Sequence, residues 1–354
     1  MKHLLWPILI LLIVARYLTT RPVYHNGDRV RITSTVYSDP INYPTAQYIK
    51  LKGLKIYLPN YPEILYGDRI IIEGVVNLSN GKLEQPKLVK IFNTSNFAAS
   101  FRNKIVSFYQ NSLPQPESGL LAGIVIGSKG ALNQDFYNLT KVAGVAHVVV
   151  ASGTNITFVV SFLIGVFTLF LTRRRAILFV ILGIVLYLFI SGFEAPLIRA
   201  AIMSIFLFAG EETGRLASTW RIFFLTASVM LIYKPDWILD IGFILSFVST
   251  GSLMLFEKRI RDKLKIVPEI LKEGLSTSLA AQIGVAPILF ITFGQFNILS
   301  PVLNALVLWT VPLIMIIGSV GGILGLIIPT FGRILLYLSY PFLWWFVKVV
   351  QWFG

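Results

Sequence analysis

The sequence predicts a polytopic α-helical membrane protein with a small all-β, OB-like domain on the outer side of the membrane. Apolar residues make up 55% of the 354 residues and charged residues only 14%, whereas soluble domains carry about 25% charged residues. Several separate apolar runs approach the roughly 17 to 25 residues that a helix needs to cross a bilayer. We therefore expect about eight or nine membrane segments, some of them broken or re-entrant.

The charge and the rare reactive residues restrict the classes of function. A net charge of +14 is typical of nucleic-acid binding, but inner-membrane proteins also collect Lys and Arg on cytoplasmic loops. The chain has no cysteine, which excludes disulfides, thiolate nucleophiles and Cys-ligated metals. His3, His25 and His147 are too scattered for an HxH or HExxH zinc motif, so we expect neither a metal nor a cofactor.

Residues 1–20 are predicted to be an N-terminal transmembrane anchor. The apolar run from Leu4 to Leu18 follows a short basic start, and no small-x-small cleavage site comes after it. We expect the N-terminus to lie in the cytoplasm, so that the anchor crosses the inner (cytoplasmic) membrane once and the next domain lies outside. The positive-inside rule supports this orientation, because it leaves four basic loops inside, at 173–175, 211–221, 257–272 and 332–333.

Residues 21–96 are predicted to form the extracytoplasmic OB-like domain. Short β-rich runs alternate here with turn signals such as Asn26-Gly27-Asp28 and Ser79-Asn80-Gly81. The phrase Gly-Asp-Arg opens a β-branched run at Gly27 and again at Gly67, as OB-like barrels often do.

Basic residues and tyrosines alternate along the same β-rich runs. Cations that follow a phosphate backbone and rings that stack on bases are the two parts of a single-strand binding surface. The alternative is that the tyrosines are cross-strand partners and membrane-interface anchors, and that the lysines form a solvated face. The DNA-binding candidates are Arg29, Arg31, Tyr48, Lys50, Lys52, Lys55, Tyr57 and Arg69.

Residues 97–146 are predicted to be amphipathic helices at the outer membrane surface. In the first of them, Phe101, Ile105 and Phe108 fall on one face, and the polar residues 102–104 fall on the other. An apolar stretch around 120–126 and a second amphipathic turn from Gln134 to Lys141 follow.

Residues 147–354 are predicted to be the multi-span channel domain. The run 195–210 is short and contains Pro196, and the run 300–328 is long, with Pro312 and several glycines, so we expect both to be broken or re-entrant. The apolar runs are 148–171, 176–193, 195–210, 220–233, 238–256, 276–293, 300–328 and 333–352.

The polar stretch from Gly144 to Asn155 leads into the first of these runs. His147 is a candidate gating group because imidazole titrates near neutral pH, or it is a histidine bonded to backbone at the start of a helix. Ser152 and His147 also fit a serine-type hydrolase, although the elbow pattern Gly-x-Ser-x-Gly is absent. The pair Ser152-Gly153 equally suits close helix packing.

Further polar side chains lie at the edges of the runs or within them. Ionisable groups in such places are functional candidates, and Glu194, Arg199 and Asp240 are of this kind. Gln282 and Asn304 lie deeper, where amides either line a channel or form hydrogen bonds between helices.

Four segments, in order, resemble the ComEC competence-protein family, whose members are DNA-uptake channels of the inner membrane. Residues 144–160 are similar to the family's Gly-(x)2-His-(x)4-Ser-Gly signature, with Asn155 and Thr157 where the family commonly has His and Gly. Residues 191–203 are similar to its Arg-Ala-(x)2-Met segment.

The other two matching segments lie further along the chain. Residues 234–247 resemble the family's Gly-Phe-Gln-Leu-Ser-Phe block, with Ile244 in place of Gln, and residues 278–304 resemble its Ala-Gln…Pro…Phe…Asn block. The resemblance covers roughly residues 20–325 and implies a form without the carboxy-terminal metallo-β-lactamase-like domain of longer members.

The resemblance implies a channel that carries single-stranded DNA across the cytoplasmic membrane during natural transformation, without nuclease activity. The chain has no GxxxxGK[ST] loop, so we expect a separate helicase-like ATPase, together with an outer DNA receptor, while the oligomeric state stays open. The alternatives are an intramembrane serine-type hydrolase and an exporter of lipid-linked or polysaccharide substrates. The channel-lining or gating candidates are His147, Ser152, Gly153, Asn155, Glu194, Arg199, Asp240, Ser246, Gln282 and Asn304.

Overall fold

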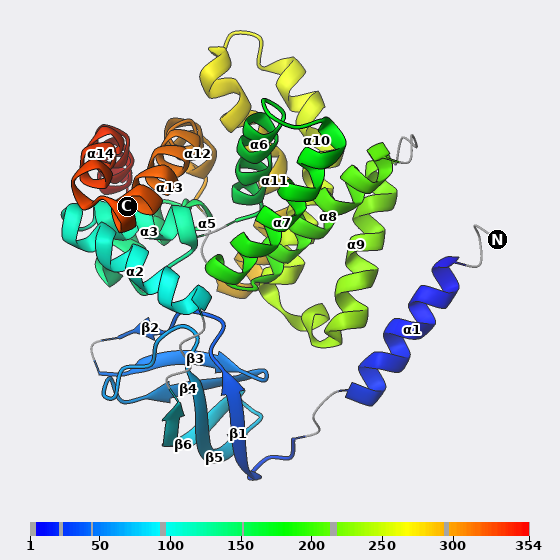
Figure 1. Ribbon diagram of the computed structural model, residues 1–354. Helices are drawn as coiled ribbons and strands as arrows, with labels where there is room; N and C mark the ends of the chain where they lie inside the picture. The colour runs from blue at the N-terminus through cyan, green and yellow to red at the C-terminus, as the bar shows by residue number, and fades with distance from the viewer. Residues whose placement is uncertain are drawn as a thin grey trace.

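The computed structural model describes residues 5–20, 24–43, 45–92, 97–150, 152–212, 218–293 and 297–353. It is a helical protein with one small β-sheet, as the sequence predicts. In Figure 1 the sheet lies below the helical body, and α1 (Leu5–Thr20) stands at one side. The ring of Trp6 in α1 packs edge-on against Phe224 of the helical body, with centroids 6.0 Å apart.

The β domain is a single curved sheet. Its strands are β1 (Arg29–Thr35), β2 (Ile41–Asn42), β3 (Gln47–Leu51), β4 (Leu54–Leu58), β5 (Arg69–Asn77) and β6 (Lys82–Phe92). The strand order is β1-β5-β6-β4-β3-β2, and every pair is antiparallel except β4 with β6. Because β1 and β2 follow each other in the chain but form the two edges, the sheet has to curve into a half-barrel.

The inner face of this half-barrel is an apolar core. Alternate residues of the strands point inward, as the period of two along a strand requires. Ile49 and Ile56 are almost fully buried where β3 and β4 pair, and Ile70 and Ile72 fill the core from β5. The polar residues between them point outward, and this positions the tyrosines and lysines considered below.

The helical body shares three buried cores. One joins α2–α5 with α12–α14, a second joins α6–α8, and a third joins α8–α10. The helices are α2 (Phe97–Ser112), α3 (Glu117–Ile126), α4 (Gln134–Val142), α5 (Ala146–Val149), α6 (Gly153–Phe167), α7 (Arg173–Ser191), α8 (Ala195–Glu212), α9 (Thr219–Tyr233), the short 3-10 helix η1 (Pro235–Leu239), α10 (Ile241–Lys263), α11 (Glu269–Phe293), α12 (Ser300–Leu308), α13 (Val311–Ile327) and α14 (Pro329–Phe353).

Four of the described helices are long and apolar enough to cross a membrane, namely α7, α10, α14 and residues 271–292 of α11. The pair α12 and α13 passes the same test as a fifth span bent by 44°. These helices support a membrane protein. The predicted number of eight or nine spans is not confirmed, because α1, α6 and α9 are apolar but shorter.

The two expected breaks have different outcomes. The bend between α12 and α13 confirms the break within 300–328. The break expected within 195–210 is wrong, because α8 is one helix from Ala195 to Glu212. Pro196 lies in its first turn, where a missing backbone N–H leaves no hydrogen bond unmade.

The predicted polar face of α2 is also partly wrong, because Arg102 is 2% exposed. The apolar helix α3 packs against α2 and α13, and every residue of α3 is buried. Glycines of α13 allow this close packing, because a Cβ on Gly322 would overlap the hydroxyl of Tyr109, which donates to the carbonyl of Gly318 at 2.9 Å.

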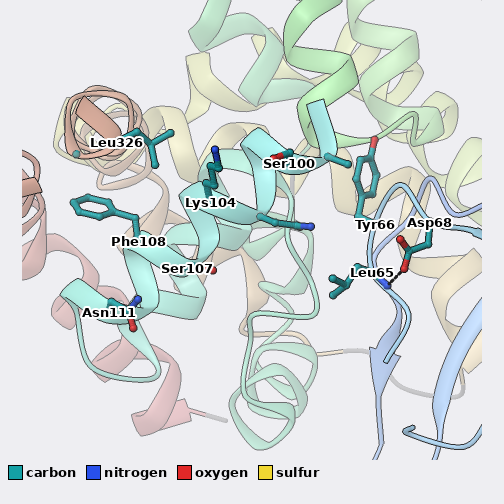
Figure 2. A pocket seen from close by; sticks show the side chains of 12 residues that line it. Leu65, Tyr66, Asp68, Ser100, Lys104, Ser107, Phe108, Asn111 and Leu326 are labelled. Carbon is teal, nitrogen blue, oxygen red and sulfur yellow. Dashed lines mark hydrogen bonds between the residues drawn. The ribbon is translucent and has the colours of Figure 1, made fainter. Parts of the chain in front are cut away.

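A cavity of about 610 Å³ lies where α2, the loop before β5 and the end of α13 meet (Figure 2). Ser100, Lys104 and Asn111 line it from α2, and Leu326 lines it from α13. Across from them, the carboxylate of Asp68 accepts a hydrogen bond from the backbone of Leu65 at 2.9 Å. None of the predicted site residues lines this cavity.

Candidate functional site

The first two turns of α6, α8 and α10 bring together three of the predicted site residues. Arg199 Nε, in the second turn of α8, donates a 2.6 Å hydrogen bond to Ser246 Oγ of α10. Gly153 begins α6, and a Cβ placed on it would lie 2.8 Å from Arg199 Nη2. We call Gly153, Arg199 and Ser246 the arginine site. Its members come from three of the four segments that carry the family resemblance.

The arginine site holds one cation, Arg199. Arg199 is half-buried, and its other polar contact is Met203 Sδ at 3.7 Å in its own helix. Among the residues that the structure describes, no carboxylate forms a salt bridge with it. The amino end of α6, where Gly153 lies, adds its positive dipole end here. The arrangement therefore attracts anions, and it offers hydrogen-bond donors that suit phosphate oxygens.

Nearer the β domain, two carboxylates pair with lysines. Glu194, which precedes α8, binds Lys129 at 2.6 Å, and Asp240, which precedes α10, binds Lys50 of β3 at 2.9 Å. We call these the interface ion pairs. A helix rises 1.5 Å per residue, so each carboxylate lies about 7 to 9 Å along its helix from the arginine site. Side-chain exposures between 26% and 49% leave both pairs accessible to water.

In each interface ion pair, each side chain stabilises the charged form of its partner. Burial alone raises the pKa of Asp240, but the hydrogen bond and charge of Lys50 outweigh it and hold that pKa below its usual range. Burial alone lowers the pKa of Lys129, and Glu194 more than reverses this. Asp240 also caps α10 by accepting from the backbone of Phe243 at 3.2 Å.

A row of tyrosines leads away from the interface ion pairs along the outer face of β3 and β4. Tyr48 and Tyr57 are cross-strand partners with ring centroids 5.1 Å apart, and Tyr43 lies 6.5 Å from Tyr57. We call Tyr43, Tyr57 and Tyr48 the tyrosine row. Lys82 Nζ lies 5.3 Å from the Tyr57 ring, and Lys55 is paired in register with Lys82.

The structure divides the predicted DNA-binding residues into two groups. Tyr48, Lys50, Lys55 and Tyr57 share the outer face of β3 and β4, while Lys52 lies in the turn that joins these strands. The arginines lie elsewhere, on β1 and β5. They are Arg29, Arg31 and Arg69, and Arg31 pairs with Glu73 at 3.5 Å.

A buried ion pair that sequence reasoning missed fixes the β domain to the helices. Asp39 accepts from Arg102 at 2.8 Å and from the hydroxyl of Ser128 at 2.7 Å. The ring of Tyr66 lies 4.7 Å from the same guanidinium, and burial raises the pKa of Tyr66 to about 12. The Gly-Ser-Lys-Gly run at 127–130, directly after an apolar helix, is the signal that could have marked this junction.

Asn155 is 1% exposed and closes the end of α3. Its amide donates to the carbonyl of Ile124 at 2.6 Å, while Tyr187 donates to Val125 at 3.0 Å and Arg102 donates to Ile126. Three successive carbonyls that have no partner within the helix are satisfied in this way. In this structure Asn155 stabilises the packing of α3, and its role in a channel stays a prediction.

His147 and Ser152 lie close in sequence but are not bonded to each other. The hydroxyl of Ser152 lies 2.6 Å from that of Thr154 and 3.2 Å from the amide oxygen of Asn155, and His147 is exposed on α5. Among the described residues, the nucleophile–base hydrogen bond that a serine hydrolase needs is therefore not formed.

Gln282 and Asn304 belong to a second polar cluster, between α11 and α12. Asn304 donates to the hydroxyl of Ser278 at 2.7 Å, and Gln282 donates to the carbonyl of Asn297 at 3.2 Å. Asn304 is 2% exposed, so its bond is a buried contact between helices, whereas Gln282 bonds to the loop before α12.

The fold and the site define a helical membrane protein with a basic, tyrosine-rich β domain and a half-buried arginine that has no carboxylate partner in the described part of the chain. The family model described as "Competence protein" matches residues 124–354, and the chain belongs to this family. The match covers all three elements of the arginine site. It confirms the ComEC-family resemblance that the sequence motifs indicate.

A curated relative extends the match towards the N-terminus. The chain is 28% identical over 260 residues to the "ComE operon protein 3" of Bacillus subtilis (strain 168), and the alignment covers 72% of this chain. The chain spans about a third of that protein, since the matched part is 31% of its length. No solved structure matches the chain.

Proposed function

We propose that this protein is a channel that carries single-stranded DNA across the cytoplasmic membrane during DNA uptake, and that it is not an enzyme. Membership of the competence family supports a role in DNA uptake. Arg199 carries the proposal further, because its half-buried guanidinium has no carboxylate partner within the residues that the structure covers and therefore suits a phosphate that passes by it.

The proposed path begins at the tyrosine row. Bases stack on the exposed rings there while the neighbouring lysines neutralise phosphates, as in other single-strand surfaces. The strand then passes the interface ion pairs and reaches the arginine site between α6, α8 and α10. Because a strand has one phosphate for each nucleotide, a series of cations at successive depths favours its movement along the path.

The proposal includes an orientation and a fold for the outer domain. The N-terminus lies in the cytoplasm, and the β domain lies outside as an OB-type barrel. The parallel pairing of β4 with β6 inside an otherwise antiparallel, curved sheet supports a Greek-key barrel of this type. An outer receptor delivers the DNA, and a separate helicase-like ATPase supplies the energy.

The test is the uptake of labelled DNA into a transformable strain whose own copy of the gene is replaced by variants. Arg199→Glu should reduce uptake at least about tenfold with an unchanged amount of protein in the membrane, because a charge-assisted contact contributes about 1.5–3 kcal/mol. Arg199→Lys should keep part of the uptake. Arg221→Glu, an exposed arginine of α9, is the matched control and should leave uptake unchanged.

Two results would contradict the proposal. Normal uptake without the protein removes the channel function altogether. Equal losses of uptake and of protein level in Arg199→Glu assign Arg199 to folding and not to the path.

A further inference from the structure

Both interface ion pairs lie close to Tyr48. Tyr48 belongs to β3 and points to the same outer face as Lys50, two residues away, and it is half-buried. Tyr48 is also the register partner of Ile41, and a Cβ on Gly130, the neighbour of Lys129, would lie 3.3 Å from the carbonyl of Pro40, which precedes Ile41. Lys50 and Lys129 therefore approach Tyr48 from its own strand and from the loop after α3, and the ring of Tyr48 continues into Tyr57.

The interface ion pairs differ from the buried pair in how readily they exchange. Asp39 and Arg102 are 8% and 2% exposed, so separating them leaves a charge without water. In the interface ion pairs every side chain keeps between 26% and 49% of its exposure. Water and salt screen such pairs, and their net contribution is small. Another anion can therefore replace their carboxylates.

A carboxylate and a backbone phosphate present the same chemistry to a lysine. Both are anions that accept charge-assisted hydrogen bonds from an ammonium group. Asp240 and Glu194 each hold one lysine beside the same aromatic ring, and a strand offers an ammonium group one phosphate per nucleotide beside one stacking base.

We propose that Tyr48, Lys50 and Lys129 form a binding site for the phosphodiester backbone of a single strand, and that Asp240 and Glu194 occupy this site when no strand is bound. The proposal rests on the proposed function and adds how its outer end is controlled. An entering strand exchanges its phosphates for the two carboxylates. The exchange also removes one contact that joins the β domain to α10 and one that joins the loop after α3 to α8.

This exchange gives the two partners of each pair opposite effects on DNA binding. Removing a carboxylate removes a competitor, so Asp240→Asn and Glu194→Gln should each tighten binding by about two- to fivefold. Removing a lysine removes the phosphate contact, so Lys50→Gln and Lys129→Gln should each weaken it by a similar factor or more. A pair with only a structural role would give the same sign for both partners.

The experiment measures the affinity of the full chain, purified in detergent micelles, for a fluorescent oligothymidylate by anisotropy. Asp240→Asn keeps the helix cap, and Asp240→Ser is a second variant that also keeps it. The matched control is Glu269→Gln, which breaks the 2.6 Å contact with Arg261 in the last turn of α10. Its affinity should equal that of the unaltered protein, and the helix content of all variants, measured by circular dichroism, should be alike.

Each outcome decides between the proposals. Tighter binding in both carboxylate variants and weaker binding in both lysine variants support the exchange. Weaker binding in all four makes the pairs structural and overturns it. If none of the four changes the affinity while uptake still depends on Arg199, the site is wrong and the channel stands. If uptake is normal without the protein, the proposed function itself fails.

Discussion

The substitution Asp39→Asn tests whether the buried ion pair holds the β domain on the helical body. The carboxylate lies 2.8 Å from Arg102 Nη2, and the two side chains are 8% and 2% exposed. Removing one partner of such a pair costs about 3–5 kcal/mol, because the other charge stays buried without compensation. Arg102 keeps its hydrogen bonds to the carbonyls of Ile126 and Ile190, so we expect a value near the lower limit, about 3 kcal/mol.

The assay is urea unfolding of the full chain in detergent, followed by tryptophan fluorescence. A loss of about 3 kcal/mol changes the ratio of folded to unfolded protein by more than a hundredfold. Glu73→Gln is the matched control in the same domain. Its 3.5 Å contact with Arg31 is largely exposed, so its removal should cost less than about 1 kcal/mol.

A double variant separates the lost attraction from the buried charge. Asp39→Asn combined with Arg102→Met removes the guanidinium as well, so the double variant should be less destabilised than an additive sum. A cost for Asp39→Asn no larger than that of Glu73→Gln would refute the reasoning. So would strictly additive effects in the double variant.

Three further predictions follow from the site. Gly153→Ala should reduce DNA uptake because its Cβ would lie 2.8 Å from Arg199 Nη2, whereas Gly165→Ala in the same helix meets nothing within 4 Å and should leave uptake unchanged. The pKa of Asp240 in the folded protein lies below its ordinary 3.8. The pair with Lys50 therefore contributes its full stability above pH 3.8 and loses it as the pH falls through the folded pKa. Protease resistance of the β domain should stay constant down to about pH 5 and then decline below about pH 4. Oligothymidylate binding should weaken steeply with added salt, and an affinity that does not respond to salt would remove the phosphate contacts from the model of binding.

The sequence was most informative where one residue pattern decides the structure. Apolar runs about long enough to cross a bilayer predict α7, α10 and α14, and the spacing of turn residues predicts the β domain. The glycines and Pro312 of 300–328 predict an irregular span, and the bend between α12 and α13 is there. The motif order also led to Arg199, Gly153 and Ser246, which the fold brings together.

Other features depend on contacts between distant segments, which periodicity does not contain. Arg102 belongs to the polar face of its helix, so its burial was not predictable until Asp39 and the end of α3 were placed beside it. Lys129 belongs to no motif, and only the fold brings it to Glu194. Asn155 was predicted from its position in a signature, but the helix packed beside it decides what its amide binds.

The capped end of α3 has a consequence for the order in which the protein is assembled. The three donors that satisfy its last carbonyls come from α2, α6 and α7, and Arg102 also binds the carbonyl of Ile190, 88 residues further along the chain. A buried carbonyl without a hydrogen-bond partner is costly, so α3 cannot reach its final state while the chain ends before α7. During synthesis α3 therefore reaches its final state only after α7 has been inserted. The insertion of α7 completes the hydrogen bonds of α3 and those of Arg102 in α2 in one step.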